Sequence, residues 1–62
     1  DKVIRIHRNT LVFKSFIEFL VEQKTENGLK WHAKIRNFTT PLPISRRQLK
    51  HVQAQFYEEE LL

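Results

Sequence analysis

The residues best suited to chemistry in this 62-residue chain are the cations at its middle, residues 27–51. This stretch contains six lysines and arginines and no carboxylate, whereas all seven acidic residues lie outside it. The cations are Lys30, Lys34, Arg36, Arg46, Arg47 and Lys50, with His32 and His51 beside them. A stretch of one charge sign creates a potential that attracts polyanions. Clustered basic side chains of this kind are typical of a surface that binds nucleic acid.

One group of these cations belongs to a predicted strand. Residues Leu29–Arg36 alternate apolar and polar without a fault, which predicts a strand with one apolar and one basic face. The basic face carries Lys30, His32, Lys34 and Arg36. If the predicted strand Val3–His7 pairs with it, Arg5 and His7 join this face. Like charges aligned in this way repel each other, which favours a polyanion partner; the alternative is a solvated face that protects an edge strand from aggregation.

The other group belongs to a predicted helix. Ser45–Gln48 has the pattern of a capping box and predicts a helix from Arg46 to about Glu60. Its first turns carry Arg46, Arg47, Lys50 and His51, and its end carries Glu58, Glu59 and Glu60. This order is the reverse of what the helix dipole favours. A helix start with free N–H groups and two arginines is suited to phosphate. The reversal equally suits two helices packed antiparallel in a homodimer.

Other kinds of chemistry find little support in the sequence. His7, His32 and His51 lack the spacing of metal ligands, and the chain has no cysteine. Both serines read as helix caps and the only aspartate is residue 1, so no catalytic triad is expected. A single glycine excludes a glycine-rich phosphate loop. We therefore expect a protein that is not an enzyme and that uses no metal, cofactor or small-molecule substrate.

Length and composition indicate one small domain over residues 1–62, either complete or excised from a larger protein. A chain this short buries only about 60 % of its unfolded surface, so its core is marginal without disulfides or a second chain. The most apolar stretch, Leu11–Val21, contains charged residues and is shorter than the ~20 residues of a membrane span. We expect no membrane partner and an intracellular location, in the cytoplasm or the nucleus.

The segment between the two predicted strands has the periodicity of a helix. Phe13, Phe16, Ile17 and Leu20 follow the spacing i, i+3, i+4 and i+7. This pattern predicts a helix from about Thr10 to Lys24, with Gly28 in the left-handed position after its end. In the competing interpretation, a capping box at Ser15–Glu18 starts the helix later and leaves Thr10–Phe13 as a strand that pairs back on the first.

Together these elements predict an α+β fold in the order strand, helix, strand, helix. Both helices are expected on one face of a two- or three-stranded sheet, with the basic face opposite. A third strand is expected at Thr10–Phe13 or at residues 38–42. The last helix has a predicted buried stripe of Leu49, Val52 and Phe56, with Ile44 as a hydrophobic staple. Trp31 alternates onto the apolar face and is expected to pack in the core.

These predictions favour a nucleic-acid-binding module. The residues expected to neutralise phosphates are Lys30, Lys34, Arg46, Arg47 and Lys50. Arg36 and His32 are expected to reach base edges. DNA is favoured over RNA, because the predicted basic face lacks the exposed aromatic side chains of a sheet that binds single strands. The alternative function is protein–protein interaction or homodimerisation through antiparallel, charge-complementary helices at the C-terminal end.

Overall fold

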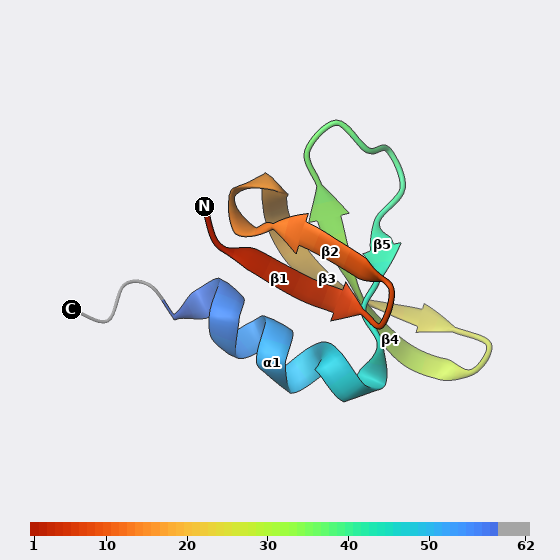
Figure 1. Ribbon diagram of the computed structural model, residues 1–62. Helices are drawn as coiled ribbons and strands as arrows, with labels where there is room; N and C mark the ends of the chain where they lie inside the picture. Colours follow the sequence, from red (N-terminus) through yellow and green to blue (C-terminus); the bar gives the residue numbers. More distant parts are fainter. Residues whose placement is uncertain (59–62) are drawn as a thin grey trace.

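A computed structural model describes residues 1–58 and shows a small α+β domain (Figure 1). Over these residues the chain forms two antiparallel sheets and one helix. The elements in chain order are β1 (Val3–His7), β2 (Thr10–Phe13), the 3-10 turn η1 (Lys14–Phe16), β3 (Ile17–Thr25), β4 (Gly28–Ile35), β5 (Leu42–Pro43) and α1 (Arg46–Tyr57). The predicted α+β class is confirmed. The predicted order of strand, helix, strand and helix is not found.

The first sheet is a hairpin of β1 and β2. Ile4 lies opposite Val12 and Val3 lies opposite Phe13. Ile4 and Ile6 are fully buried, so the face that they share points into the core. Figure 1 shows β1 between α1 and β2, which leaves β2 at the outside of the hairpin. The predicted strand Val3–His7 is confirmed.

The helix predicted from Thr10 to Lys24 is wrong, because this segment forms β2, η1 and β3. A β-bulge between Ile17 and Phe19 explains the misleading periodicity. The extra residue brings Ile17 and Leu20, three positions apart, into the same core, as a helix would. The competing interpretation is confirmed for Thr10–Phe13, which is a strand paired with β1. Its later helix from Ser15 is wrong as well.

The second sheet has the order β3-β4-β5. Thr25 and Gly28 close the β3–β4 hairpin: the Thr25 hydroxyl donates to the Gly28 carbonyl at 2.8 Å and accepts from the Asn27 N–H at 3.2 Å. Gly28 has a φ of 109°, so the expected left-handed glycine ends a hairpin and not a helix. The predicted strand Leu29–Arg36 is confirmed with a shift of one residue at each end.

The last two elements follow the predictions more closely. β5 lies at the end of the proposed strand region 38–42 and pairs with His32 and Ala33 of β4. α1 begins as predicted, with the Ser45 hydroxyl accepting from the Gln48 N–H at 3.3 Å. Its predicted end near Glu60 lies outside the described residues. No second helix accompanies it among residues 1–58, so the expected pair of helices on one face is wrong.

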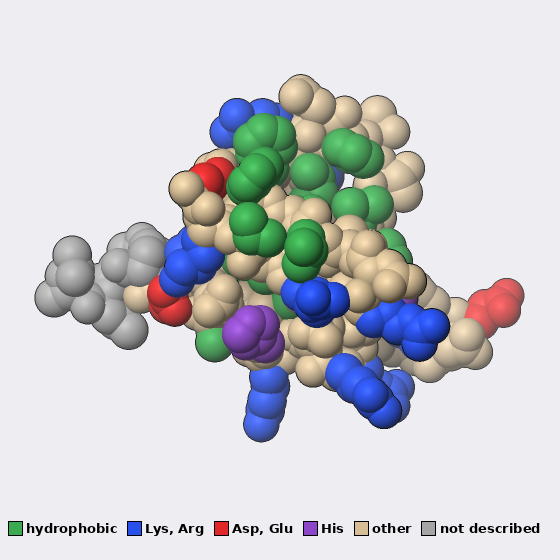
Figure 2. All heavy atoms as spheres, in the orientation of Figure 1, with side chains coloured by type: hydrophobic (Ala, Val, Ile, Leu, Met, Phe, Trp, Pro, Cys, Tyr) green, Lys and Arg blue, Asp and Glu red, His purple; other side chains and the backbone are tan. Residues whose placement is uncertain are grey.

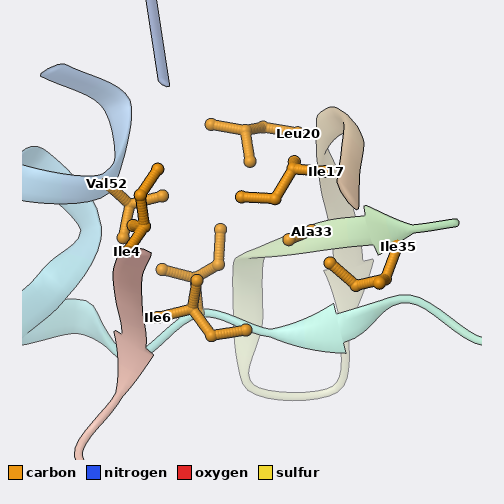
Figure 3. Packing of buried hydrophobic residues seen from close by; sticks show 8 residues of the cluster. Ile4, Ile6, Ile17, Leu20, Ala33, Ile35 and Val52 are labelled. Carbon is orange, nitrogen blue, oxygen red and sulfur yellow. The ribbon is translucent and has the colours of Figure 1, made fainter. Parts of the chain in front are cut away.

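The core lies between the two sheets and α1 (Figure 3). Its eight buried side chains are Ile4, Ile6, Ile17, Leu20, Ala33, Ile35, Ile44 and Val52. Leu49 and Phe56 of α1 pack against this cluster beside Val52, which confirms the predicted helical stripe. Trp31 also packs against it but is only partly buried. A core this small leaves the domain with little stability to spare.

Candidate nucleic-acid interface

A pocket of about 410 Å³ lies where the end of β1, the outer half of β4 and the start of α1 come together. Four residues of the predicted site line it, namely His7, Lys30, His32 and Arg46. They come from three segments that are far apart in the sequence. Among residues 1–58, no carboxylate lines the pocket. The fold therefore gathers part of the basic stretch around one concavity.

Two backbone hydrogen bonds hold these segments together. The Ile44 N–H donates to the Trp31 carbonyl at 3.0 Å, and the Ser45 N–H donates to the Ile6 carbonyl at 2.9 Å. The second bond also occupies the N–H that a complete capping box would have satisfied from Gln48. Consecutive residues before α1 are thus joined to β4 and to β1. These two hydrogen bonds place Arg46, the next residue in the sequence, beside β1 and β4.

His32 lies in the wall of the pocket, between two neighbouring strands. Val21 of β3 is its partner on one side and Pro43 of β5 on the other, which explains why the imidazole is only partly exposed. Its Nδ1 is buried and makes no hydrogen bond to any of residues 1–58. A buried polar atom without a partner destabilises a fold by about 1–3 kcal/mol.

The remaining cations of α1 extend the basic surface beyond the pocket. Arg47, Lys50 and His51 are exposed. Figure 2 shows lysine and arginine side chains gathered over the side of the molecule formed by α1, and hydrophobic side chains over the opposite part of the same view. The ion pairs Lys2–Glu58 and Lys34–Glu18 involve none of these α1 cations.

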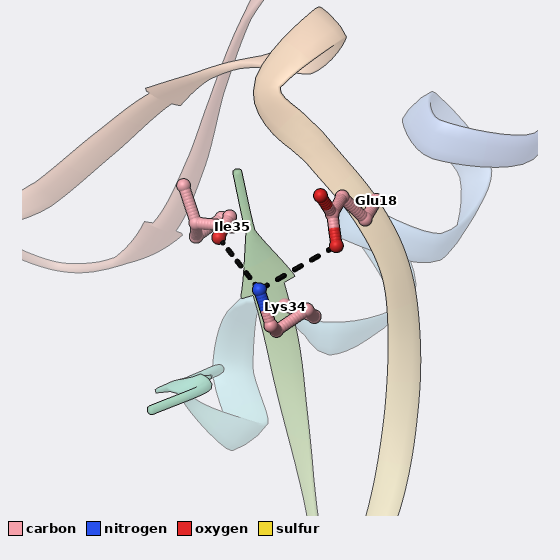
Figure 4. A network of polar contacts seen from close by, with 3 residues as sticks. All are labelled: Glu18, Lys34 and Ile35. Carbon is pink, nitrogen blue, oxygen red and sulfur yellow. Dashed lines mark hydrogen bonds and ion pairs between the residues drawn. The ribbon is translucent and has the colours of Figure 1, made fainter. Parts of the chain in front are cut away.

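Lys34 has a different environment from the other predicted site residues (Figure 4). Its Nζ lies 3.0 Å from the Ile35 carbonyl and 3.4 Å from Glu18 Oε1. Only 23 % of its side chain is exposed, and it does not line the pocket. The sequence showed no acid within the basic stretch. The neighbouring strand β3 nevertheless supplies one, because pairing brings Glu18 beside β4.

Arg36 and Arg5 also lie outside the pocket. The Arg36 guanidinium donates to the Ser15 carbonyl at 3.4 Å and lies over the ring of Phe16. Arg5 donates from Nη1 to the Arg8 carbonyl at 2.7 Å. Both side chains are exposed on the surface, but each has a local partner. The predicted single basic face is therefore divided between the pocket and three outlying residues, Arg5, Lys34 and Arg36.

Two aromatic residues near these basic side chains have positions that the sequence did not predict. Phe19 is the partner of Lys34 across the sheet and is 49 % exposed, so it shares the predicted basic face. An interpretation of residues 17–25 as a strand would have found it. Trp31 lines the pocket as well as packing against the core. The premise that the basic face lacks exposed aromatic residues is therefore wrong.

Comparisons with known proteins add no family to this geometry. No protein-family model matches the chain, and no curated protein or solved structure is significantly similar to it. Within residues 1–58, no helix combines the length and apolar character needed to cross a bilayer. The same residues contain no group of three or more histidine and carboxylate side chains arranged to hold a metal ion.

Proposed function

We propose that the domain binds nucleic acid through its basic surface, defined as the basic residues that line the pocket together with those at the exposed start of α1. This surface consists of His7, Lys30, His32, Arg46, Arg47, Lys50 and His51. The observation that carries the proposal is the convergence of Lys30 and Arg46 from separate elements on a pocket without carboxylates. Like charges brought together by folding are unfavourable on their own, and a polyanion would stabilise them.

In this proposal the main contribution to affinity comes from contacts with phosphates. Arg46, Arg47 and Lys50 lie on the first turns of α1, where unpaired backbone N–H groups add to their positive potential. Each phosphate neutralised by a cation releases condensed counterions, so the affinity depends on salt. His32 lines the pocket and is partly exposed, which suits it to a contact with a sugar or a base.

The preference for DNA over RNA stays a prediction. The argument for this preference was the lack of exposed aromatic residues on the basic face. That argument is wrong, because Phe19 is an exposed aromatic residue on this face. Phosphate contacts are available on duplexes and on single strands alike. A single strand would in addition stack its bases on exposed aromatic rings. A comparison of both substrates is therefore part of the test.

The proposal can be tested by NMR titration of the chain with a short DNA duplex and with a single strand of equal length. We expect amide shifts concentrated in residues 27–51 and around His7, with the residues of β2 unaffected. Stronger shifts at Phe19 with the single strand would assign the surface to unpaired bases. The proposal is overturned if neither substrate shifts any amide at low salt, where non-specific contacts are strongest.

A second candidate function is dimerisation through antiparallel copies of α1. It is favoured by the exposure of Arg46, Arg47 and Lys50 along one helix. In the described residues Glu58 already pairs with Lys2 of its own chain at 2.5 Å. Glu59 and Glu60 lie outside the described residues. This helix-to-helix dimer remains an alternative, and it predicts that removing the α1 arginines abolishes association.

A further inference from the structure

A group of exposed apolar residues lines a second hollow, which shares no lining residue with the pocket. Five large hydrophobic residues, namely Val3, Leu11, Phe13, Phe16 and Phe38, are between 40 % and 58 % exposed and line one hollow of about 420 Å³. The better-buried residues Val12, Ile35 and Leu42 complete this apolar groove. Figure 2 shows hydrophobic side chains gathered over this part of the molecule. Exposed apolar patches of this kind mark interaction sites.

The groove arises from the hairpin of β1 and β2. Val3 and Phe13 are partners across this hairpin, and Leu11 is the partner of Arg5. Side chains alternate between the two faces of a strand, so Leu11 and Phe13 point away from Ile4 on the core side, whereas Val12 packs against the core and also lines the groove. The domain's own core therefore cannot cover them. Over residues 1–58, the five large residues of the groove stay between 40 % and 58 % exposed.

The outer edge of β2, a strand of four residues, borders the groove. Over the described residues β2 pairs with β1 alone. Its sequence Thr10–Phe13 contains no charged residue and no proline. Natural proteins usually protect an edge strand with lysine, proline or a bulge, because a bare edge pairs with another strand. β2 contains neither lysine nor proline, and the exposed apolar groove lies beside it.

The size of the groove surface matches what a second copy would need. A phenylalanine carries about 150–250 Å² of surface, so the exposed parts of the five residues amount to roughly 450 Å². Homodimer interfaces are about 65 % apolar, so this area corresponds to roughly 700 Å² per copy. Stable interfaces bury about 800 Å² per partner.

We propose that two copies of this chain associate through the apolar groove, with β2 of one copy antiparallel to β2 of the other. A strand that pairs with its own copy does so about a two-fold axis, which makes the contact isologous. In this arrangement Leu11 and Phe13 of each copy cover the groove of the other. The result is one continuous sheet in which neither β2 has a free edge.

The proposed interface leaves the pocket open. The groove and the pocket share no lining residue. A dimer of this kind would carry two basic surfaces, which strengthens binding to a long polyanion without any new contact. The proposal itself does not depend on nucleic acid binding, because it is carried by the groove and by the edge of β2.

Sedimentation velocity of the 62-residue chain over a range of concentrations tests the proposal. We expect a dimer with a dissociation constant on the order of micromolar, as is common for interfaces of this size. Phe13→Lys and Leu11→Lys should each weaken association by about tenfold or more. Phe19→Lys is the matched control, because Phe19 and Phe13 are both 49 % exposed and Phe19 lies outside the groove. The control should change association by less than about twofold.

Two results overturn the proposal. One is a wild-type chain that stays monomeric up to hundreds of micromolar, on the order of the weakest specific associations. The other is loss of the dimer in Phe19→Lys but not in Leu11→Lys, which would place the interface elsewhere. If the chain is monomeric and a single strand or a foreign peptide shifts the amides of Leu11 and Phe13, that ligand occupies the groove in place of a second copy. Amide spectra of each variant establish that it is folded.

Discussion

The guanidinium of Arg36 lies over the ring of Phe16, with Cζ 5.2 Å from the ring centroid. The same two residues are joined through the backbone, because the Arg36 N–H donates to the Phe16 carbonyl at 2.8 Å. This double contact fastens the end of β4 to the 3-10 turn. It lies beyond the opposite end of β4 from the pocket, whose β4 residues are Leu29 to His32. Among residues 1–58, Arg36 thus has a side-chain partner, whereas Lys30 and Arg46 have none.

Arg36→Ala should therefore reduce stability more than binding. Loss of an exposed cation–π contact is expected to lower the free energy of unfolding by about 0.5–1 kcal/mol. Its effect on nucleic acid affinity should be smaller than that of Lys30→Ala, since Lys30 lines the pocket. Urea denaturation and fluorescence anisotropy with labelled DNA measure the two effects. If both variants lost the same affinity and Arg36→Ala kept the wild-type stability, the assignment of Arg36 to stability and of Lys30 to binding would be contradicted.

The burial of Ile6 and Trp31 predicts different losses of stability when each side chain is truncated to alanine. Ile6 is completely buried, so Ile6→Ala should lower the free energy of unfolding by about 2–5 kcal/mol, enough to unfold much of a domain this small. Trp31 is only partly buried, so Trp31→Ala should be less destabilising than its size alone would imply. Thermal denaturation followed by circular dichroism compares them. A Trp31→Ala variant less stable than Ile6→Ala would contradict the described burial.

The turn between β3 and β4 depends on backbone conformation at one position. Gly28 has a φ of 109°, and a Cβ added there would meet no atom within 4 Å. Gly28→Ala should therefore destabilise the fold through backbone strain alone, by about 1–3 kcal/mol. Asn37, with a φ of 70°, is the control: Asn37→Gly relieves strain and should leave stability equal or higher. Urea midpoints measure both, and an unchanged midpoint in Gly28→Ala would count against the described turn.

The ion pair between Lys2 and Glu58 predicts a pH-dependent contribution to stability. The hydrogen bond from Lys2, assisted by its charge, holds the pKa of the Glu58 carboxyl below its ordinary value. A lowered pKa in the folded state stabilises the protein above the ordinary carboxyl range, and this gain is lost as the pH falls through the folded pKa. The melting temperature of wild type should thus exceed that of Glu58→Gln at neutral pH and approach it in acid. A difference that persists unchanged at acid pH would exclude the ion pair as its source.

The sequence predicted those elements whose side chains keep one regular period. β4 alternates along its whole length, and its predicted range differs from the structure by one residue at each end. The start of α1 was equally clear, because Ser45 has the side chain that caps a helix. Local chemistry determines both features, so no knowledge of the tertiary structure was needed.

Residues 10–25, which form β2, η1 and β3, could not be predicted in the same way. A 3-10 turn and a bulge shift the phase of β2 and β3, so Ile17 and Leu20 imitate the spacing of a helix. The environment of the predicted basic face depended on that region too. Glu18 beside Lys34 and Phe19 on the basic face follow from pairing between β3 and β4, which only the fold reveals. The cations themselves were identified from the sequence, whereas their division into pocket and outlying positions was not.

The salt dependence of DNA affinity tests the proposed function most directly. The wild-type affinity should fall linearly with salt on logarithmic axes, and Arg46→Ala with Arg47→Ala should make the slope shallower by roughly two, about 0.9 per phosphate contact. The matched control is Lys2→Ala with Lys14→Ala, which removes the same charge from residues joined by a backbone hydrogen bond beyond the other end of β1. The control should keep the wild-type slope. Equal slopes in the two double variants, or no affinity at low salt, would contradict a nucleic acid site at the start of α1.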